Sequence, residues 1–253
     1  MQTIQPVLSE VNMMKRYSLI ERYGMLRSRF SIILEDAKTA TDIALGKRLN
    51  LLRKGFYSWH DTLYNLEHND INDYLSEYER RKTRFINGQA SYILSNKLVC
   101  DQILRQYVRT ATIYSIIWHG NICCVDTERT ITDCESIIKY MNESGPLILK
   151  PNSGADGGRG VMLICIQNGR ILCNESQIDP DDLEKLIESL DEYIVCEFIR
   201  QGEYGNYLFV ETVNSIRILT MLCPQEHKPF VAASIQRIGT CASKPVDNWS
   251  AGG

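Results

Sequence analysis

A lysine and a run of glycines separate two apolar segments in the stretch LILKPNSGADGGRGVMLI, residues 147–164. Glycine has no Cβ, so the backbone N–H groups of such a loop can approach an anion closely. Lys150, at the end of the first apolar segment, would add a fixed positive charge for phosphate oxygens. About ten residues connect the two segments, whereas a hairpin turn needs two to five. The stretch therefore predicts a loop that closes over a phosphate, or a flexible connection without a ligand.

Two familiar kinds of phosphate loop do not describe this stretch. A Walker-type loop places its lysine after the glycines, whereas Lys150 precedes them. A dinucleotide-binding loop opens a helix, whereas this loop joins two segments that both have the composition of strands. A strand-to-strand loop with a lysine at its base favours a nucleotide lid, and an idle loop stays open as the alternative.

A second segment, EYIVCEFIRQGE at residues 192–203, could hold the rest of a nucleotide. Its apolar residues predict a strand that emerges through Glu197, Phe198 and Ile199, where free backbone groups would match the edge of an adenine. Glu203, four residues beyond Ile199, could accept hydrogen bonds from the two hydroxyls of a ribose. The alternative for Glu203 is an exposed loop carboxylate.

The elements that would position these residues divide the chain into two parts. Residues 1–90 are predicted to be a helical region, with apolar residues recurring at three-to-four spacing. Its first helix carries the stripe Val11, Met14, Tyr17, Ile20, Leu26, Phe30, Ile33 and Leu34. A second helix is predicted at 69–85. Because such stripes need a surface to cover, we expect this region to pack on the rest of the chain.

Residues 91–253 are predicted to form an α+β domain in which hairpins and helices alternate. A helix at 95–107 opens it. Strands are predicted at 110–118, 121–125, 147–151, 161–167, 170–174, 193–199, 214–223 and 229–237. Asn168 and Gly169 form a strong signal for a tight hairpin. Thr132 and Glu135 predict a capping box for one helix, and Asp179 followed by Pro180 predicts the start of another.

Composition excludes several classes of protein. The net charge of −3 and the 23% of charged residues give no sign of a nucleic-acid partner. No apolar stretch approaches the roughly 20 residues of a membrane helix, so no membrane insertion is expected. The nine cysteines form no C-x-x-C pair and mostly stand in apolar runs, which predicts packing in a reducing cytoplasm.

Taken together, these motifs resemble the ATP-grasp superfamily, and most closely its sugar-transfer-associated family. Four stretches carry the resemblance: YLSEYERRKTRFINGQASYILSNKLVCDQIL, LILKPNSGADGGRGV, VETVNSIRILTML and VDNWSAGG, which together span residues 74–253. The phrases VNSIR and VDNWS are the specific ones. The resemblance implies an α+β fold in which ATP lies between two lobes and the glycine loop covers its phosphates.

The resemblance also implies roles for individual residues. Those matching ATP-binding positions are Lys97, Lys150, Ser153, Gly154, Gly157, Gly158, Gly160, Cys196, Glu197, Ile199, Glu203 and Asn248. Within this set, Lys97 and Lys150 would contact phosphates, the stretch from Ser153 to Gly160 would form the lid, and Glu203 would bind the ribose. Arg217 matches the arginine that steadies the transferred phosphate, and Arg237 lies in the same region of the motif set.

One part of the family pattern is missing. ATP-grasp enzymes hold Mg²⁺ with an acidic residue and a later Glu and Asn pair, whereas this sequence stops at Gly253 after VDNWSAGG. We therefore expect the metal ligands beyond Gly253 and assign none within the chain. A fragment or truncation is the favoured explanation, and a broken reading frame or a protein that binds nucleotide without chemistry are the alternatives.

The reaction implied by the resemblance is ATP-dependent ligation of a carboxylate to an amine through an acyl phosphate. A small carboxylate or a sugar-linked compound would be the substrate, and surface polysaccharide or secondary metabolism the setting. A phosphotransferase on the same fold and a non-catalytic nucleotide-binding protein are the alternatives. Neither the particular substrates nor the oligomeric state can be read from the sequence.

Overall fold

The computed structural model describes residues 18–39, 42–88, 90–125, 131–155, 157–223, 225–244 and 246–253. The chain divides into two compact units, residues 1–91 and residues 92–253. We describe each unit by itself.

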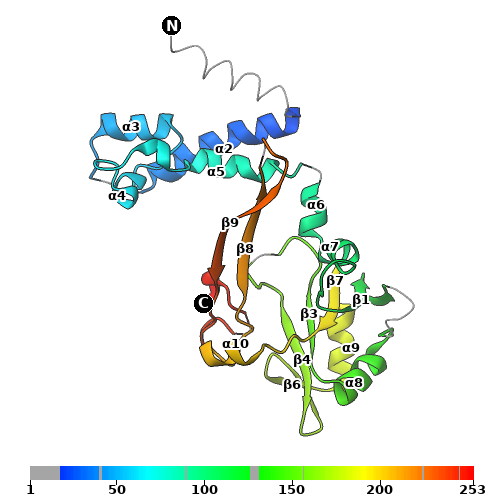
Figure 1. Cartoon of the computed structure of the whole chain (residues 1–253). Coiled ribbons are helices and arrows are strands. Elements are labelled where there is room, and N and C mark those ends of the chain that lie inside the picture. The colour runs from blue at the N-terminus through cyan, green and yellow to red at the C-terminus, as the bar shows by residue number, and fades with distance from the viewer. Residues whose placement is uncertain are drawn as a thin grey trace. The chain divides into compact units, whose positions relative to one another are not determined.

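The first unit is helical (Figure 1). Its elements are α2 (Leu19–Ala37), α3 (Leu45–Arg53), α4 (His60–Tyr64), the 3-10 turn η1 (Ile71–Asp73), α5 (Glu77–Lys82) and the 3-10 turn η2 (Thr83–Phe85). The helix predicted at 69–85 is interrupted, because the Ser76 hydroxyl accepts from the Glu79 amide and starts a new helix there. A further helix, α6 (Ala90–Ser95), crosses the boundary between the units.

The apolar stripe predicted for the first helix is not buried inside this unit. Exposed side chains of α2 include Ile20, Leu26, Phe30, Ile33 and Leu34. The helix instead buries Met25, Ser28, Ile32 and Asp36. Its buried face is partly polar because Asp36 accepts from the Ser58 amide at 2.6 Å and pairs with Arg48 at 2.8 Å. Val11, Met14 and Tyr17 lie outside the described residues.

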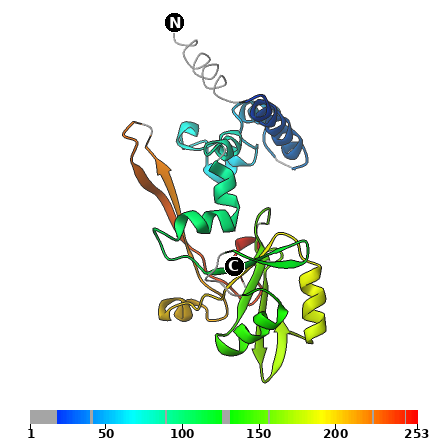
Figure 2. The ribbon, with the colours of Figure 1, turned by 90° about the vertical axis from the view of Figure 1, so that its right-hand side faces the viewer.

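A seven-stranded antiparallel sheet dominates the second unit (Figures 1 and 2). Its strands are β1 (Ile113–Trp118), β2 (Asn121–Cys124), β3 (Leu147–Pro151), β4 (Met162–Gln167), β5 (Arg170–Cys173), β6 (Ser176–Ile178) and β7 (Tyr193–Glu197). The spatial order is β2-β1-β7-β3-β4-β5-β6, so β7 inserts between two strands that precede it by many residues. The hairpin predicted at Asn168 and Gly169 is present, with both residues at positive φ, whereas β6 was not predicted.

Two helices cover one face of this sheet. Helix α8 (Cys134–Glu143) contributes Ile137 and Met141, and α9 (Pro180–Glu188) contributes Leu183 and Ile187, to a core that includes Leu149. Asp179 caps α9 as predicted.

The prediction of a Thr132–Glu135 capping box for α8 is wrong by one residue. Asp133 is the cap and Ser136 completes the box. The Thr132 hydroxyl bonds to the Asp133 carboxylate at 2.9 Å instead of to the helix.

The remaining elements of the second unit lie outside the large sheet. Helix α7 (Lys97–Leu104) contributes Leu98 to the small cluster on the other sheet face. Helix α10 (Glu203–Leu208) follows β7, and β8 (Ile216–Leu222) pairs with β9 (Pro229–Gln236) in a separate two-stranded sheet. A short 3-10 turn, η3 (Trp249–Ala251), lies close to Gly253. The α+β class predicted from the sequence is confirmed.

Candidate functional site

The register of the large sheet sends Lys150 to one particular face. Successive residues of a strand point to opposite faces. Leu147 and Leu149 are fully buried under α8 and α9, so Ile148 and Lys150 point to the other side. Ile148 lies opposite Cys196 of β7, and Lys150 lies opposite Ile194. Cys196 and Ile194 form a cluster there with Leu98, so Lys150 shares its face with α7.

The two lysines predicted to contact phosphates meet on this face. Lys97 is the first residue of α7, and its ammonium group donates to the Pro151 carbonyl at 2.6 Å and, more weakly, to the Asn152 carbonyl at 3.4 Å. Burial, together with the positive charge of Lys150, lowers the pKa of Lys97. Burial raises the pKa of the Cys196 thiol, against the opposing effect of Lys150. Two positive charges held close together in a partly dry site suit a polyanion.

The amides at the start of α7 are all used by the protein. The Lys97 amide donates to the Asn152 carbonyl at 3.0 Å, the Leu98 amide to Asn152 Oδ1 at 2.9 Å, and the Val99 amide to Asn96 Oδ1 at 3.0 Å. This helix end therefore offers no free amide among its first three to an anion, and the predicted phosphate contacts are the lysine side chains. Asn152 was not among the predicted site residues. Nothing in the sequence around it indicates that its side chain accepts from the first turn of a helix far away along the chain.

Contacts with neighbouring segments restrict the glycine loop. A Cβ on Gly158 would lie 2.8 Å from Val246, one on Gly157 would lie 2.9 Å from Ser250, and one on Gly160 would lie 2.6 Å from the Tyr193 hydroxyl. All three glycines have positive φ, as does Gly154, whose Cβ would meet nothing within 4 Å. At the loop base the Ser153 hydroxyl donates to Glu192 Oε2 at 3.2 Å. The loop thus rests on the VDNWS segment.

Asp247 holds that segment in place. Its carboxylate accepts from the Ser215 amide at 3.0 Å, from the Ser215 hydroxyl, and from Arg237 in an ion pair of 2.8 Å. Arg237 also donates to Asn248. Both residues of the ion pair are largely buried, so the residues just before β8 and just after β9 are fixed to the segment that contacts the glycine loop. The structure brings Arg237 and Asn248 together, and their predicted roles in nucleotide binding stay predictions.

Arg217 stands on β8, two residues after Ser215. It is exposed on β8, opposite Ile235 of β9, and it forms no ion pair with any residue that the structure describes. Its assignment as a catalytic residue stays a prediction.

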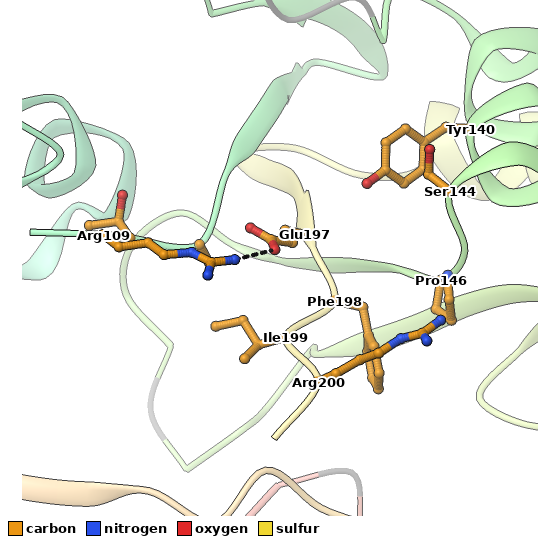
Figure 3. Close-up of a pocket in the computed structure, with 10 residues that line it drawn as sticks. Arg109, Tyr140, Ser144, Pro146, Glu197, Phe198, Ile199 and Arg200 are labelled. Atoms are coloured by element: carbon orange, nitrogen blue, oxygen red, sulfur yellow. Dashed lines mark ion pairs between the residues drawn. The ribbon is translucent and has the colours of Figure 1, made fainter. Parts of the chain in front are cut away.

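The predicted hinge lines a cavity of about 560 Å³ (Figure 3). The cavity is lined by Arg109, Thr110, Ala111, Tyr140, Ser144, Pro146, Glu197, Phe198, Ile199 and Arg200. The Glu197 carboxylate accepts from the Thr112 amide at 3.0 Å and lies 3.5 Å from Arg109. Ile199 also lines a second, more apolar cavity of about 550 Å³ with Val210. Both volumes fall within the range of small-molecule sites.

Glu203 is the exposed first residue of α10. The loop before it is fixed by Asn214, whose amide group donates to Gln201 Oε1 at 3.0 Å, to the Gly205 carbonyl at 2.9 Å and to the Phe209 carbonyl at 2.7 Å. Asn214 belongs to the VNSIR phrase. Its contacts give the VNSIR phrase a structural role, because they fix the start of β8 to the helix that begins with Glu203.

The described residues contain no group of three or more His, Cys, Asp or Glu side chains that could hold a metal ion. Asp247 is already bonded to Ser215 and Arg237. The expectation that Mg²⁺ is held by ligands beyond Gly253 stays a prediction.

An antiparallel α+β lobe with two converging lysines, a strand-to-strand glycine loop and a hinge cavity defines a nucleotide-binding protein of the ATP-grasp type. A family model described as sugar-transfer associated ATP-grasp matches residues 77–253, and the chain belongs to that family. Comparisons with curated proteins and with solved structures found no match. The resemblance stated from the motifs is thereby confirmed, and ATP binding follows from it. No helix in the part of the chain that the structure describes is long and apolar enough to cross a bilayer.

Proposed function

We propose that the protein, in its complete form, is an ATP-dependent carboxylate–amine ligase that acts through an acyl phosphate. The substrate carboxylate attacks the γ-phosphorus of ATP and ADP leaves. The amine then attacks the acyl carbon, an amide forms, and inorganic phosphate leaves with the electron pair of the broken C–O bond. The observation that carries the proposal is the convergence of Lys97 and Lys150 beside the glycine loop.

The chain's residues would act by positioning and by neutralising charge. Lys97 and Lys150 would balance charge on the phosphates, and the loop from Ser153 to Gly160 would cover them. Arg217 would stabilise negative charge as it develops on the transferred phosphoryl group. Bound Mg²⁺ would neutralise further phosphate charge, and we assign it no ligand among the described residues.

The rest of the nucleotide would occupy the hinge. Backbone groups near Glu197 and Ile199 would bind the adenine, with the cavity of about 560 Å³ giving it room. Glu203 would accept from the ribose hydroxyls, since its carboxylate is exposed at the start of α10. A small carboxylate or sugar-linked substrate and a role in surface polysaccharide or secondary metabolism complete the proposal, and the family's description as sugar-transfer associated supports a sugar-linked compound. The proposed cytoplasmic location rests on the cysteine pattern of the sequence.

Nucleotide binding is tested by thermal unfolding with and without Mg·ATP. Ligand at about a hundred times its Kd stabilises a protein by roughly 2.7 kcal/mol, which raises the Tm by several degrees. We expect this shift in the unaltered chain and its loss in Lys150→Ala. Lys139→Ala is the matched control, because Lys139 is an exposed lysine of α8, a helix packed on the opposite face of the sheet. Equal shifts in all three proteins would contradict the proposed site.

The reaction type is tested by the products formed with candidate carboxylates and amines. ADP, phosphate and an amide support the ligase. ADP with a stable phosphoester would instead indicate a phosphotransferase, and nucleotide binding without ADP release would indicate a non-catalytic protein.

A further inference from the structure

We propose that Asn152 is a positioning residue that holds Lys97 beside Lys150 and so sets the affinity of the site for the phosphates of ATP. The inference rests on the proposed function and adds a residue to which neither the motif nor the family match assigns a role.

Asn152 connects three separate parts of the second unit. Its side-chain oxygen accepts from the Leu98 amide at 2.9 Å, and its carbonyl accepts from the Lys97 amide at 3.0 Å. Its own amide donates to the Glu192 carbonyl at 2.7 Å. The residue is 5% exposed. The end of β3, the start of α7 and the turn before β7 are therefore fixed to one buried amide side chain and its backbone.

This connection bears directly on the two charges. Lys150 lies on β3, two residues before Asn152. The Lys97 amide donates to the Asn152 carbonyl, and the Lys97 ammonium group donates to the Pro151 carbonyl at 2.6 Å. The carbonyls of Pro151 and Asn152 hold the Lys97 ammonium against the repulsion of Lys150. If α7 moved from the end of β3, both carbonyls would move away from Lys97. The spacing of the two ammonium groups thus depends on the Asn152 side chain.

Asn96 provides a natural comparison within the same helix. It is 7% exposed and caps α7 through the Val99 amide at 3.0 Å. Its side chain donates to the Tyr92 hydroxyl at 3.1 Å and forms none of the described bonds to β3. Loss of Asn96 should weaken the helix end as much as loss of Asn152, but it should leave the helix tied to the strand.

The test measures Kd values of Mg·ATP and of adenosine by calorimetry for the unaltered chain, Asn152→Ala, Asn96→Ala, Lys97→Met and the double variant Asn152→Ala/Lys97→Met. We expect Asn152→Ala to weaken ATP binding about tenfold, the effect of one lost buried hydrogen bond, and to leave adenosine binding within about twofold. Asn96→Ala should change both affinities little. In the Lys97→Met background, Asn152→Ala should cause no further loss of ATP affinity.

Any other result would overturn either the inference or the proposed function. Equal losses for ATP and adenosine, equal effects of the two asparagine variants, or a full additional loss in the double variant would overturn the inference, because Asn152 would then act on the fold and not through Lys97. Failure of the unaltered chain to bind ATP would overturn the proposed function, and the inference with it. Unfolding midpoints measured for every variant identify a variant that does not fold, and in that case Asn152→Leu, which has a similar size and no acceptor, replaces Asn152→Ala.

Discussion

Lys97 has an environment unlike that of an ordinary surface lysine. Its ammonium group is partly buried, bonded to backbone carbonyls and close to a second positive charge. Burial and the charge of Lys150 both disfavour the protonated form and lower its pKa. A bound polyphosphate would reverse this effect. If Lys97 contacts the phosphates as proposed, its protonation should therefore be coupled to nucleotide binding.

ATP affinity should depend on this protonation. Because the pKa of Lys97 is lowered, the ammonium form is lost as pH rises through a value below its usual 10.5, and phosphate affinity is lost with it. We expect the Kd for ATP to increase in the unaltered chain as the pH rises toward 10.5. Lys97→Arg, which stays charged over this range, should flatten the profile. Identical profiles by calorimetry would show that Lys97 does not contact the phosphates.

Sequence patterns predicted the residues with local signals and missed those defined by distant contacts. The lysine and glycines of 150–160 could be recognised because a strand-to-strand loop of that length is unusual. Asn152 could not, because its role depends on α7, which precedes it by more than 40 residues. Asp247 was left without a role for the same reason, since its partners are Ser215 and Arg237.

At the scale of elements, the glycine loop and the segment 246–250 form one packed pair. The loop backbone lies so close to this segment that two of its glycines, Gly157 and Gly158, leave no free room for a Cβ. The ion pair of Asp247 and Arg237 fixes the segment in turn to the residues flanking the β8–β9 hairpin. Glycine is thus required at these two positions for close approach, in addition to the access to phosphate that we propose for the loop.

Two glycine substitutions separate the requirement for close approach from the requirement for a positive φ. Gly154 and Gly158 both have positive φ, at 70° and 81°, so alanine at either position costs about 1–2 kcal/mol of folding free energy. Gly158→Ala also brings a Cβ to 2.8 Å from Val246, which adds about 1–3 kcal/mol. Denaturant unfolding should therefore show Gly158→Ala to be the less stable of the two. Val246→Ala should recover much of this difference, and equal stabilities would contradict the contact.

Predicted elements followed the same division between local and distant signals. The Asn168–Gly169 hairpin and the Asp179 cap were correct because their chemistry lies within a few residues. The place of β7 between β1 and β3 had no local signal. The stripe of α2 does not match the face that the helix buries in its own unit, which carries Met25 and Ile32 beside Ser28 and Asp36 with its partner Ser58.

At the scale of the whole molecule, the two units are stabilised by different kinds of contact. The second unit has an apolar core of eleven buried residues between the large sheet and α8 and α9, and its buried Asp247–Arg237 ion pair lies outside that core. The first unit buries the polar and charged side chains of Asp36, Ser58, His60 and Glu77 beside a few apolar ones. Buried charges make stability depend on protonation, whereas apolar contacts do not.

The first unit should therefore be the more sensitive to acid. Burial would raise the pKa of Asp36, but hydrogen bonds from Ser58 and Arg48 outweigh it and lower the pKa below 3.8. That stabilisation is present above pH 3.8 and is lost as pH falls through the lower folded value. Burial also lowers the pKa of His60, so protonation of the unfolded chain below about pH 6.5 favours unfolding. Hydrogen exchange should show α2 losing protection at a higher pH than β3.

Asp36→Asn provides the control for this prediction. Breaking a buried ion pair costs about 3 kcal/mol, so the variant should be less stable at pH 7 and its stability should change less between pH 5 and 3. An unchanged acid profile, or simultaneous loss of protection in both units of the unaltered chain, would show that the buried polar network does not control acid stability.

The hydrogen bonds that occupy the first amides of α7 have a consequence for the salt dependence of nucleotide binding. Because its first three amides are bonded within the protein, the helix contributes no free donors to an anion, and attraction rests on two ammonium groups. Fields from point charges are screened by mobile ions over about 8 Å at physiological ionic strength. Potassium chloride should therefore compete with the nucleotide, and log Kd for ATP should rise with log salt concentration while log Kd for adenosine stays nearly level.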